Sequence, residues 1–324
     1  MKPIILFACP QMDLLARRIV VAQGSHVVAG QIDWKYFDDG WPDFKIEIGN
    51  EDDLRGYDVA FLAAFENPHD SVVQRWVMNA FRYFQARSLT IILPYFPTGT
   101  MERTDKKGRI VTAKSLARDL SSIPSCACMQ NRLVIWDIHA LPEWFTFEGH
   151  SVLPILTSAI PLLKARIDRL PYYENVSIVF PDEGAQKRFG GQFYDFPHII
   201  CDKHREGDKR IITLKEGAPR GRDCLIVDDL MLTGETQDAC AKVVSAGGAK
   251  TISMYVTHLV APKQSWRRFC NVEYPLEHFW YTDSCTSTHA EIAVLDRRTH
   301  PFEVLSLQGQ ITSQVLGVRD YFEN

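Results

Sequence analysis

The chain has 324 residues, more than the roughly 50–200 of one typical domain, so two domains are expected. Its formal net charge of −4, from 36 basic and 40 acidic residues, argues against a binding surface for nucleic acid or an anionic membrane. No apolar run approaches the roughly 18 residues that cross a bilayer. Pro10 and the charges of Asp13 and Arg17 interrupt the apolar start, so we expect no signal peptide and a cytoplasmic protein.

Short β-branched runs alternate with stretches of helical spacing along the whole chain. This alternation predicts an α/β fold in which each half is a mostly parallel sheet flanked by helices. The predicted strands are Ile4–Ala8, Val59–Ala63, Thr90–Leu93, Leu133–Ile138, Ser177–Phe180, His198–Cys201, Cys224–Val227 and Ile252–Val256. The predicted helices are Leu14–Gln23, Ser71–Arg87, Ala113–Ser121, Ser158–Leu170 and Gln237–Ala246.

We expect an N-terminal domain over residues 1–150 and a C-terminal domain over residues 151–324, joined near His150–Pro161. No low-complexity linker separates the two. The final stretch, Gln308–Phe322, has helical character and is compatible with packing on either domain.

The segment Trp136–Ala140 (WDIHA) ends an apolar strand. Asp137 and His139 are two residues apart, so both side chains project from the same face. A carboxylate and an imidazole at a strand end can hold a cation, although Mg²⁺ prefers oxygen ligands. On these residues alone, a hydrogen-bonded core histidine is the favoured interpretation.

The segment Cys201–Ile211 (CDKHREGDKRI) is typical of a charged hairpin with Gly207 at its turn. A solvated hairpin is the usual interpretation of such a run. The alternative is a loop that brings some of its Lys and Arg side chains to the phosphates of a ligand, where positive charge stabilises a phosphoryl-transfer transition state.

The most informative segment is Asp223–Thr236 (DCLIVDDLMLTGET), an apolar strand followed by two adjacent acids and a Thr-Gly-x-Thr turn before a helix. Ligands of parallel sheets lie at the carboxyl ends of strands, and a helix N-terminus offers N–H groups to a phosphate. Asp228 and Asp229 would then hold sugar hydroxyls or a metal. The alternative is a purely structural role, in which Thr233 is a helix N-cap after a solvated turn.

This segment resembles the phosphoribosyl-diphosphate motif of type I phosphoribosyltransferases and of ribose-phosphate diphosphokinase. The ribose-phosphate diphosphokinase family is favoured, because further motifs of that family occur here in the same order and over nearly the whole chain. These motifs are Tyr95–Arg103 (YFPTGTMER), Thr112–Pro124, Trp136–Ala140, Phe180–Phe189 (FPDEGAQKRF), the hairpin and Tyr255–Val260. Four segments look most like the divergent class II known from plants: Tyr36–Phe44, Pro97–Arg103 (PTGTMER), Lys203–Ile211 and Phe279–Cys285.

The resemblance implies two tandem type I phosphoribosyltransferase-like domains and a Mg²⁺-dependent transfer of the β,γ-diphosphate of ATP to the 1-hydroxyl of ribose 5-phosphate, with release of AMP. It implies Lys203 and Arg205 as catalytic residues, and His139, Asp182 and, less directly, Asp137 as metal ligands. The implied ribose 5-phosphate residues are Asp228, Asp229, Leu232, Thr233, Gly234, Glu235 and Thr236. The implied ATP residues are Phe37, Asp39, Gly40, Trp41, Thr100, Met101 and Arg103. It also implies a homo-oligomer with the nucleotide site near a subunit interface.

The chain departs from class I members at several of these positions. Leu232 and Glu235 replace an Asp and a Gly, Trp41 replaces a Glu, and Thr100-Met101 replaces Arg-Gln. Members of class II act without added phosphate and accept other nucleoside triphosphates, and we expect the same here. Two alternatives stay open: a phosphoribosyltransferase that consumes the diphosphate product, and a non-catalytic regulatory homologue.

Overall fold

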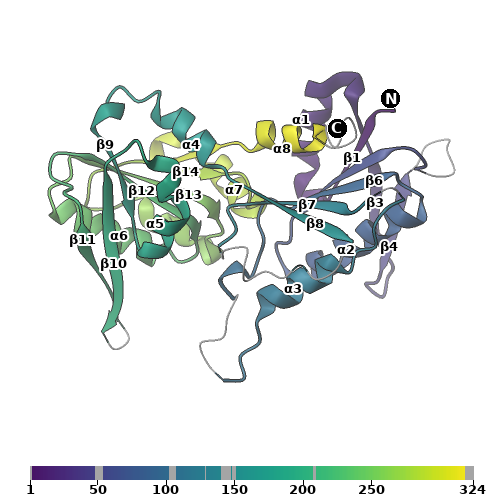
Figure 1. Cartoon of the computed structure of the whole chain (residues 1–324), viewed down its shortest axis with the longest axis horizontal. Helices are drawn as coiled ribbons and strands as arrows, with labels where there is room; N and C mark the ends of the chain where they lie inside the picture. Colours follow the sequence, from purple (N-terminus) through teal and green to yellow (C-terminus); the bar gives the residue numbers. More distant parts are fainter. Residues whose placement is uncertain are drawn as a thin grey trace. The chain divides into compact units, whose positions relative to one another are not determined.

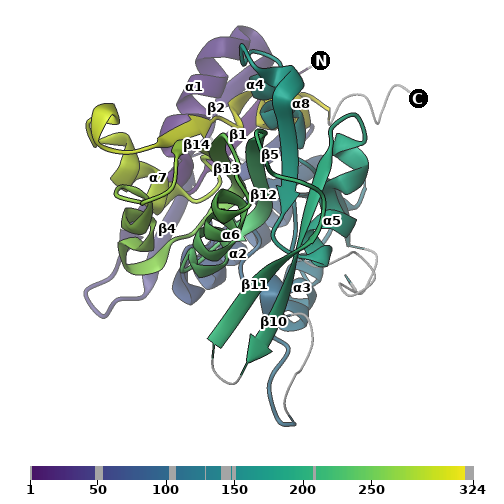
Figure 2. The same ribbon diagram turned by 90° about the vertical axis from the view of Figure 1, so that its left-hand side faces the viewer.

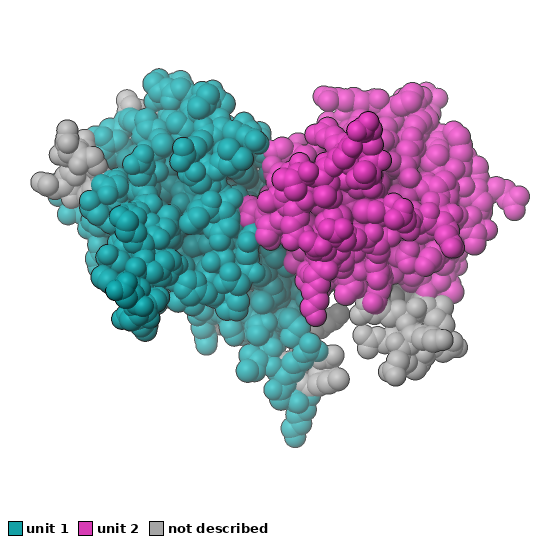
Figure 3. Space-filling view, turned by 180° about the vertical axis from the view of Figure 1, so that it is seen from behind, with its two compact units in different colours: residues 1–157, 307–324 teal, residues 158–306 magenta. Residues whose placement is uncertain are grey.

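A computed structural model describes residues 2–47, 54–101, 107–127, 129–139, 147, 151–206 and 209–317, without the side chains of residues 203–211. The chain divides into two compact units, Met1–Thr157 with Leu307–Asn324, and Ser158–Ser306. Figure 3 colours the two units separately. Each unit is an α/β layer structure of its own, so the predicted fold class is confirmed.

The first unit is built on a six-stranded sheet in the order β2-β1-β5-β6-β7-β8, with every pairing parallel. Its central strands are buried along their full length, which is why they read as unbroken apolar runs. The strands are β1 (Ile4–Ala8), β2 (Val27–Ala29), β5 (Asp58–Leu62), β6 (Ser88–Ile92), β7 (Asn131–Trp136) and β8 (Val152–Thr157). The α-helices are α1 (Asp13–Gln23), α2 (Pro68–Tyr83), α3 (Thr112–Ser121) and α8 (Gln308–Leu316), and short 3-10 turns are η1 (Pro10–Met12), η2 (Gly24–His26) and η3 (Gly99–Met101).

A separate antiparallel hairpin of β3 (Gln31–Tyr36) and β4 (Pro42–Glu47) belongs to the first unit. The sequence pattern did not predict it, because its polar residues hide the apolar alternation. Figure 1 labels both strands.

The helix α8 clusters with the first unit. Trp136 Nε1 donates to Gln310 Oε1 over 2.7 Å, and the guanidinium of Arg132 donates to Gln314. The helix begins at Gln308, as expected, and the predicted continuation to Phe322 lies partly outside the described residues.

The second unit is built on a seven-stranded sheet in the order β11-β10-β9-β12-β13-β14-β15. All pairings are parallel except the β10–β11 hairpin at one edge. The strands are β9 (Val176–Phe180), β10 (His198–Glu206), β11 (Lys209–Glu216), β12 (Asp223–Met231), β13 (Thr251–Leu259), β14 (Leu276–Thr282) and β15 (Phe302–Leu305). The helices are α4 (Ile160–Ile167), α5 (Glu183–Phe189), α6 (Glu235–Ala246) and α7 (Thr286–Ala293), with 3-10 turns η5 (Tyr173–Asn175), η6 (Gly190–Phe193), η7 (Pro262–Phe269) and η8 (Arg297–Thr299).

The two faces of this sheet carry two separate hydrophobic clusters. Ile226 of β12 packs with Cys240 and Val244 of α6, whereas Val227 packs on the face covered by α4 and α5. Side chains alternate between the faces along each strand, so helices on both sides are needed to bury β12. Figure 2 shows α6 in front of β12 and β13.

Several predicted boundaries were wrong. The strand predicted to end at Val227 continues to Met231, so Asp228 and Asp229 lie within β12 and not after it. The parallel partner β13 extends with it, pairing Asp228 with Val256 and Met231 with Leu259. Pairing in the sheet therefore overrides the low strand propensity of two adjacent acids.

Among the described residues, no helix is both long enough and apolar enough to cross a membrane.

Candidate active site

The loop between β12 and α6 is held by hydrogen bonds to the segment that follows β13. Ser265 Oγ donates to the Leu232 carbonyl over 2.5 Å. The backbone N–H groups of Val260 and Ala261 both donate to the Met231 carbonyl, at 3.1 and 3.2 Å. The loop therefore enters α6 with a defined backbone, while the side chains of Leu232 and Thr233 stay exposed.

Gly234 is the residue that allows this turn. Its φ of +75° lies in the left-handed region, which costs a residue with a Cβ roughly 1–2 kcal/mol. A Cβ here would also lie 2.7 Å from Cε2 of Phe269, a ring buried in the core. Gly234 is the N-cap of α6, so the helix begins with its first N–H groups beside the loop, as an anion site requires.

The side chains of Glu235 and Thr236 begin α6. Glu235 is exposed, and Thr236 is partly buried. Because the side chain of Glu235 faces solvent, its charge is screened from the loop more than a buried carboxylate would be.

Asp228 is contacted from the helix that follows it. Gln237 Nε2, in the first turn of α6, donates to Asp228 Oδ2 over 3.0 Å, and the Asp229 N–H donates to Asp228 Oδ1 over 3.0 Å. Burial raises the pKa of Asp228 well above its ordinary value, and the neighbouring charge of Asp229 raises it further. The charge of Asp182 adds to this effect, so the three carboxyl groups belong to one electrostatic cluster.

Arg188 supplies the positive charge that faces this cluster. Its Nη1 lies 2.5 Å from Oδ1 of Asp229, whose side chain is 1% exposed. The same guanidinium opposes the upward shift of the Asp228 pKa. Neither Arg188 nor Gln237 was predicted from the sequence. The signals that the sequence offers are that Arg188 lies in the same motif as Asp182 and that Gln237 is a polar residue at the start of the predicted helix.

Asp182 is the N-cap of α5, with its Oδ1 accepting from the Ala185 N–H over 2.9 Å. The residue was predicted to follow strand Ser177–Phe180 in a turn, and the helix that begins there was missed. The cap contact uses one carboxylate oxygen, and within the described residues the second oxygen makes no hydrogen bond. The cap holds the carboxylate at the start of α5.

Lys203 and Arg205 lie on β10, in the hairpin predicted from the charge pattern. Antiparallel pairing sets Lys203 opposite Ile212 and Arg205 opposite Arg210. The side chains of both residues, and Gly207 at the turn, lie outside what the structure describes.

In the first unit, a separate group of predicted residues gathers at the carboxyl ends of β6 and β7. A Cβ placed on Gly99 would lie 3.3 Å from Cβ of His139, so the glycine-containing turn packs directly on the histidine. Thr98 and Asp137 both have positive φ, at +65° and +32°, a strained conformation for residues with a side chain. Among the described residues, Thr98 Oγ1 finds no hydrogen-bond partner although it is buried. Strain and a buried, unsatisfied hydroxyl together are typical of a ligand site.

Thr100 and Met101 continue this turn as part of η3. Thr100 is exposed, and Met101 Sδ lies 3.4 Å from Nη2 of Arg109. Arg103 lies outside the described residues.

The predicted adenine-side residues form the turn of the β3–β4 hairpin. Phe37 and Gly40 close it through backbone hydrogen bonds, and Gly40 has a φ of +85°. Asp39 Oδ1 accepts from the Trp41 N–H over 3.0 Å, so Asp39 also stabilises the turn. The aromatic rings of Phe37 and Trp41 are 54% and 62% exposed, which makes them available to a ligand or a partner chain.

The implied metal is Mg²⁺, and its protein ligands would come from the side chains described above. Across the described residues, no three His, Cys, Asp or Glu side chains are arranged to hold a metal ion by themselves. The carboxylate of Asp182 and its like-charged neighbours nonetheless fit a Mg²⁺ bound mostly through phosphate and water oxygens, because that ion needs only one or two protein carboxylates. His139 offers nitrogen, which Mg²⁺ prefers less.

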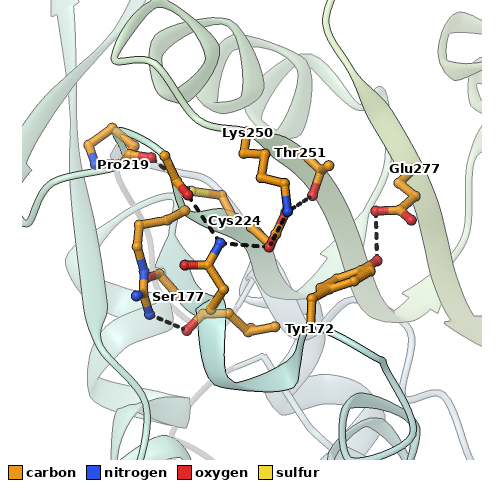
Figure 4. Close-up of polar contacts among 12 residues, drawn as sticks. Tyr172, Ser177, Pro219, Cys224, Lys250, Thr251 and Glu277 are labelled. Atoms are coloured by element: carbon orange, nitrogen blue, oxygen red, sulfur yellow. Dashed lines mark hydrogen bonds and ion pairs between the residues drawn. The ribbon is translucent and has the colours of Figure 1, made fainter.

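The opposite end of β12 has a different character. Asp223 there is 3% exposed and accepts from Asn175 Nδ2 at 2.7 Å and Thr251 Oγ1 at 2.8 Å, with Lys250 Nζ at 3.5 Å. Figure 4 shows Lys250 and Thr251 converging in this network. The carboxylate of Asp223 is thus paired by side chains of the protein itself.

Comparisons with known proteins agree with this geometry. Residues 4–123 match the family model described as the N-terminal domain of ribose phosphate pyrophosphokinase, and residues 136–287 match the phosphoribosyl transferase domain. The fold and the loop thus define a protein of the phosphoribosyltransferase type.

The curated relatives narrow this class. The chain is 47% identical over 317 residues to "Ribose-phosphate pyrophosphokinase 3, chloroplastic" of Oryza sativa subsp. japonica, covering 96% of this chain and 76% of the relative. It is 45% identical to "Ribose-phosphate pyrophosphokinase 4" of the same plant, covering 96% and 94%. A relative from Spinacia oleracea, 45% identical, is named mitochondrial. The chain belongs to the ribose-phosphate pyrophosphokinase family.

The fold is also that of a solved structure. Phosphoribosylpyrophosphate synthetase from Mycobacterium smegmatis superposes with a TM-score of 0.79 at 19% identity, covering 99% of this chain and 100% of that one. At this identity the likeness concerns the fold alone.

Proposed function

We propose that this chain synthesises 5-phosphoribosyl 1-diphosphate by transferring the β,γ-diphosphate of ATP to the 1-hydroxyl of ribose 5-phosphate, with AMP as the second product. The observation that carries the proposal is the identity of 47% over 96% of the chain to a ribose-phosphate pyrophosphokinase. The strand–acid pair–Gly234–helix arrangement supports it from the chemistry of the site.

Ribose 5-phosphate binds on the loop that runs from Asp228 to Thr236. The phosphate accepts from the backbone N–H groups at the start of α6, where the helix dipole favours an anion. Asp228 and Asp229 hold the sugar hydroxyls through hydrogen bonds to their carboxyl groups. The left-handed backbone of Gly234, with φ of +75°, supports this placement, because it sets the turn from which the first N–H groups of α6 are presented.

The reaction forms one bond and breaks one bond. The anomeric oxygen of the sugar attacks the β-phosphorus of ATP, the bond from that phosphorus to the α,β-bridging oxygen breaks, and the hydroxyl proton passes to solvent. Negative charge spreads over the phosphoryl oxygens in the transition state, so positioned cations accelerate the step. Lys203 and Arg205, carried by the β10–β11 hairpin, supply that charge when the hairpin closes over the phosphates and excludes water.

Asp182 and His139 would bind Mg²⁺ that accompanies the nucleotide, with Asp137 as a further ligand or as a support for His139. The ion would neutralise part of the charge on the diphosphate. The N-cap geometry of Asp182 supports this role, because the cap holds the carboxylate in place before any cation arrives.

The nucleotide end uses the hairpin turn Phe37–Trp41 and the turn Thr98–Arg103. Trp41 stacks on a base without reading its hydrogen-bonding edge, so other nucleoside triphosphates are accepted beside ATP. The exposed rings of the turn favour a homo-oligomer in which this turn serves a neighbouring subunit. As in class II members, turnover does not need added inorganic phosphate.

The experiment that tests the function measures AMP by chromatography after incubating the purified chain with Mg²⁺ and ATP, with and without ribose 5-phosphate. We expect AMP only when the sugar phosphate is present, in amounts equal to 5-phosphoribosyl 1-diphosphate. Consumption of 5-phosphoribosyl 1-diphosphate with a free base, without AMP from ATP, would indicate a phosphoribosyltransferase. Absence of both reactions would leave only a non-catalytic role.

A further inference from the structure

The β3–β4 hairpin depends on aromatic packing for its position. A two-stranded sheet alone is marginally stable, and this hairpin is not paired with the six-stranded sheet. Midway along the hairpin, the ring of Trp34 lies 4.8 Å from Phe44 and 6.5 Å from Phe61, a buried residue of β5. These contacts fix the middle of the hairpin but not the turn that carries Trp41.

Two aromatic pairs connect the turn end of the hairpin to α2. Tyr36 lies 5.8 Å from the ring of His69, and Trp41 lies 6.0 Å from Trp76 with the two rings only 3° from parallel. His69 and Trp76 are seven residues apart, about two helical turns, so they project from the same side of α2. The end of the hairpin therefore lies along one stripe of the helix.

The Trp41–Trp76 stack is not part of the hydrophobic core. The rings of Trp41 and Trp76 are 62% and 44% exposed, while α2 faces the core through Val73, Val77 and Phe81. Exposing two large aromatic rings to water is unfavourable in free energy unless another molecule or segment covers them. An offset parallel pair holds each indole in one orientation and leaves an outer face of Trp41 for a planar ligand.

We propose that Trp76 is a positioning residue for the nucleotide: it holds the indole of Trp41 in the orientation that stacks on the base of the triphosphate. The inference rests on the proposed function, in which Trp41 contacts that base. A tryptophan at an exposed turn would otherwise lose side-chain freedom on each binding event, and preorganisation removes this cost. The effect of one ordered side chain on affinity is about 2- to 10-fold.

Trp76→Leu tests the proposal. The variant keeps an apolar side chain of good helix propensity but loses the stack. We expect KM to rise about 2- to 10-fold for ATP and similarly for GTP and CTP, because stacking is insensitive to the base. The kcat and the KM for ribose 5-phosphate stay as in the wild type, and Trp76→Phe recovers part of the lost affinity. Tyr83→Leu is the matched control, since Tyr83 is an exposed aromatic seven residues further along the same helix.

A double-mutant cycle shows whether Trp76 acts through Trp41. Once Trp41→Ala has removed the stacking ring, adding Trp76→Leu has no further effect on the nucleotide KM. An unchanged KM in Trp76→Leu, an equal effect in the Trp41→Ala background, or a parallel loss of kcat and of sugar affinity would each overturn the inference. If the wild-type chain forms no AMP with ribose 5-phosphate, the proposed function itself fails, and that outcome is visible before any variant is made.

Discussion

Among the side chains near the site, Arg188 is the one whose replacement should lower the folding stability of the second unit most. In Arg188→Met the stem volume is kept, but Asp229 loses the guanidinium 2.5 Å from its Oδ1. The Asp229 side chain is 1% exposed, so its charge is left without a partner in a buried place. Breaking such a pair costs about 3–5 kcal/mol when both groups are fully buried.

The expected loss lies below that range because the Arg188 side chain is 17% exposed and water can partly replace it. We expect a loss of about 2–3 kcal/mol. For a unit of about 150 residues this corresponds to a fall in Tm of roughly 4–12 °C. Differential scanning calorimetry of wild type and variant measures this shift.

The loss of stability in Arg188→Met should also grow as the pH rises. The pKa of Asp228 is raised in the folded protein, so the folded state binds more protons than the unfolded state between the ordinary and the raised value, and stability falls as pH rises through that interval. Arg188 opposes the raised pKa, so its removal widens the interval. The Tm difference should therefore be smaller at pH 5 than at pH 8, and Arg188→Met with Asp229→Asn should recover most of it. A Tm within 2 °C of wild type at pH 8, or no recovery in the double variant, would refute the reasoning.

Four further outcomes are expected. Lys203→Ala should lower kcat by about 10³-fold or more while the KM for ribose 5-phosphate changes little, because the cation acts mainly in the transition state; near-normal turnover in steady-state assays would remove Lys203 from the mechanism. Asp228→Asn should raise the KM for ribose 5-phosphate more than that for ATP, and the reverse order would show that the loop binds the nucleotide. Gly234→Ala should lower the stability of the second unit by about 1–3 kcal/mol in thermal unfolding and weaken sugar-phosphate binding, and a variant with unchanged Tm would contradict the backbone strain argued for this turn. His139→Ala and Asp182→Asn should each need more free Mg²⁺ for half-maximal activity, whereas unchanged Mg²⁺ titrations in both would exclude the metal role.

The sequence predicted strands that are buried along their length, such as β5, β6 and β7, and it also predicted the half-buried start of β10, but it missed β14 and the β3–β4 hairpin. Strand β1 was predicted with its observed bounds, because an unbroken apolar run leaves no doubt about burial. The β3–β4 hairpin was missed, since Lys35, Lys45 and the acids between them obscure the alternation. Its stability comes from aromatic contacts with residues far along the chain, such as Phe61, which local patterns do not contain.

The same limit applies to the site. The loop at Gly234 was recognised because all its features are contiguous in the sequence. Arg188 and Gln237 were missed because their roles depend on which side chains α5 and α6 direct toward β12. Trp76 was missed for the same reason, since only the packing of the hairpin on α2 brings it to Trp41.

In the proposed reaction, a diphosphate group passes intact from ATP to the sugar. The most direct measurement uses ATP labelled with ³²P in the γ-phosphate, together with ribose 5-phosphate and Mg²⁺, and follows the label by thin-layer chromatography. We expect the label to appear in 5-phosphoribosyl 1-diphosphate while unlabelled AMP forms in equal amount. Label transferred to the sugar with ADP as the other product, or released as inorganic phosphate, would contradict it.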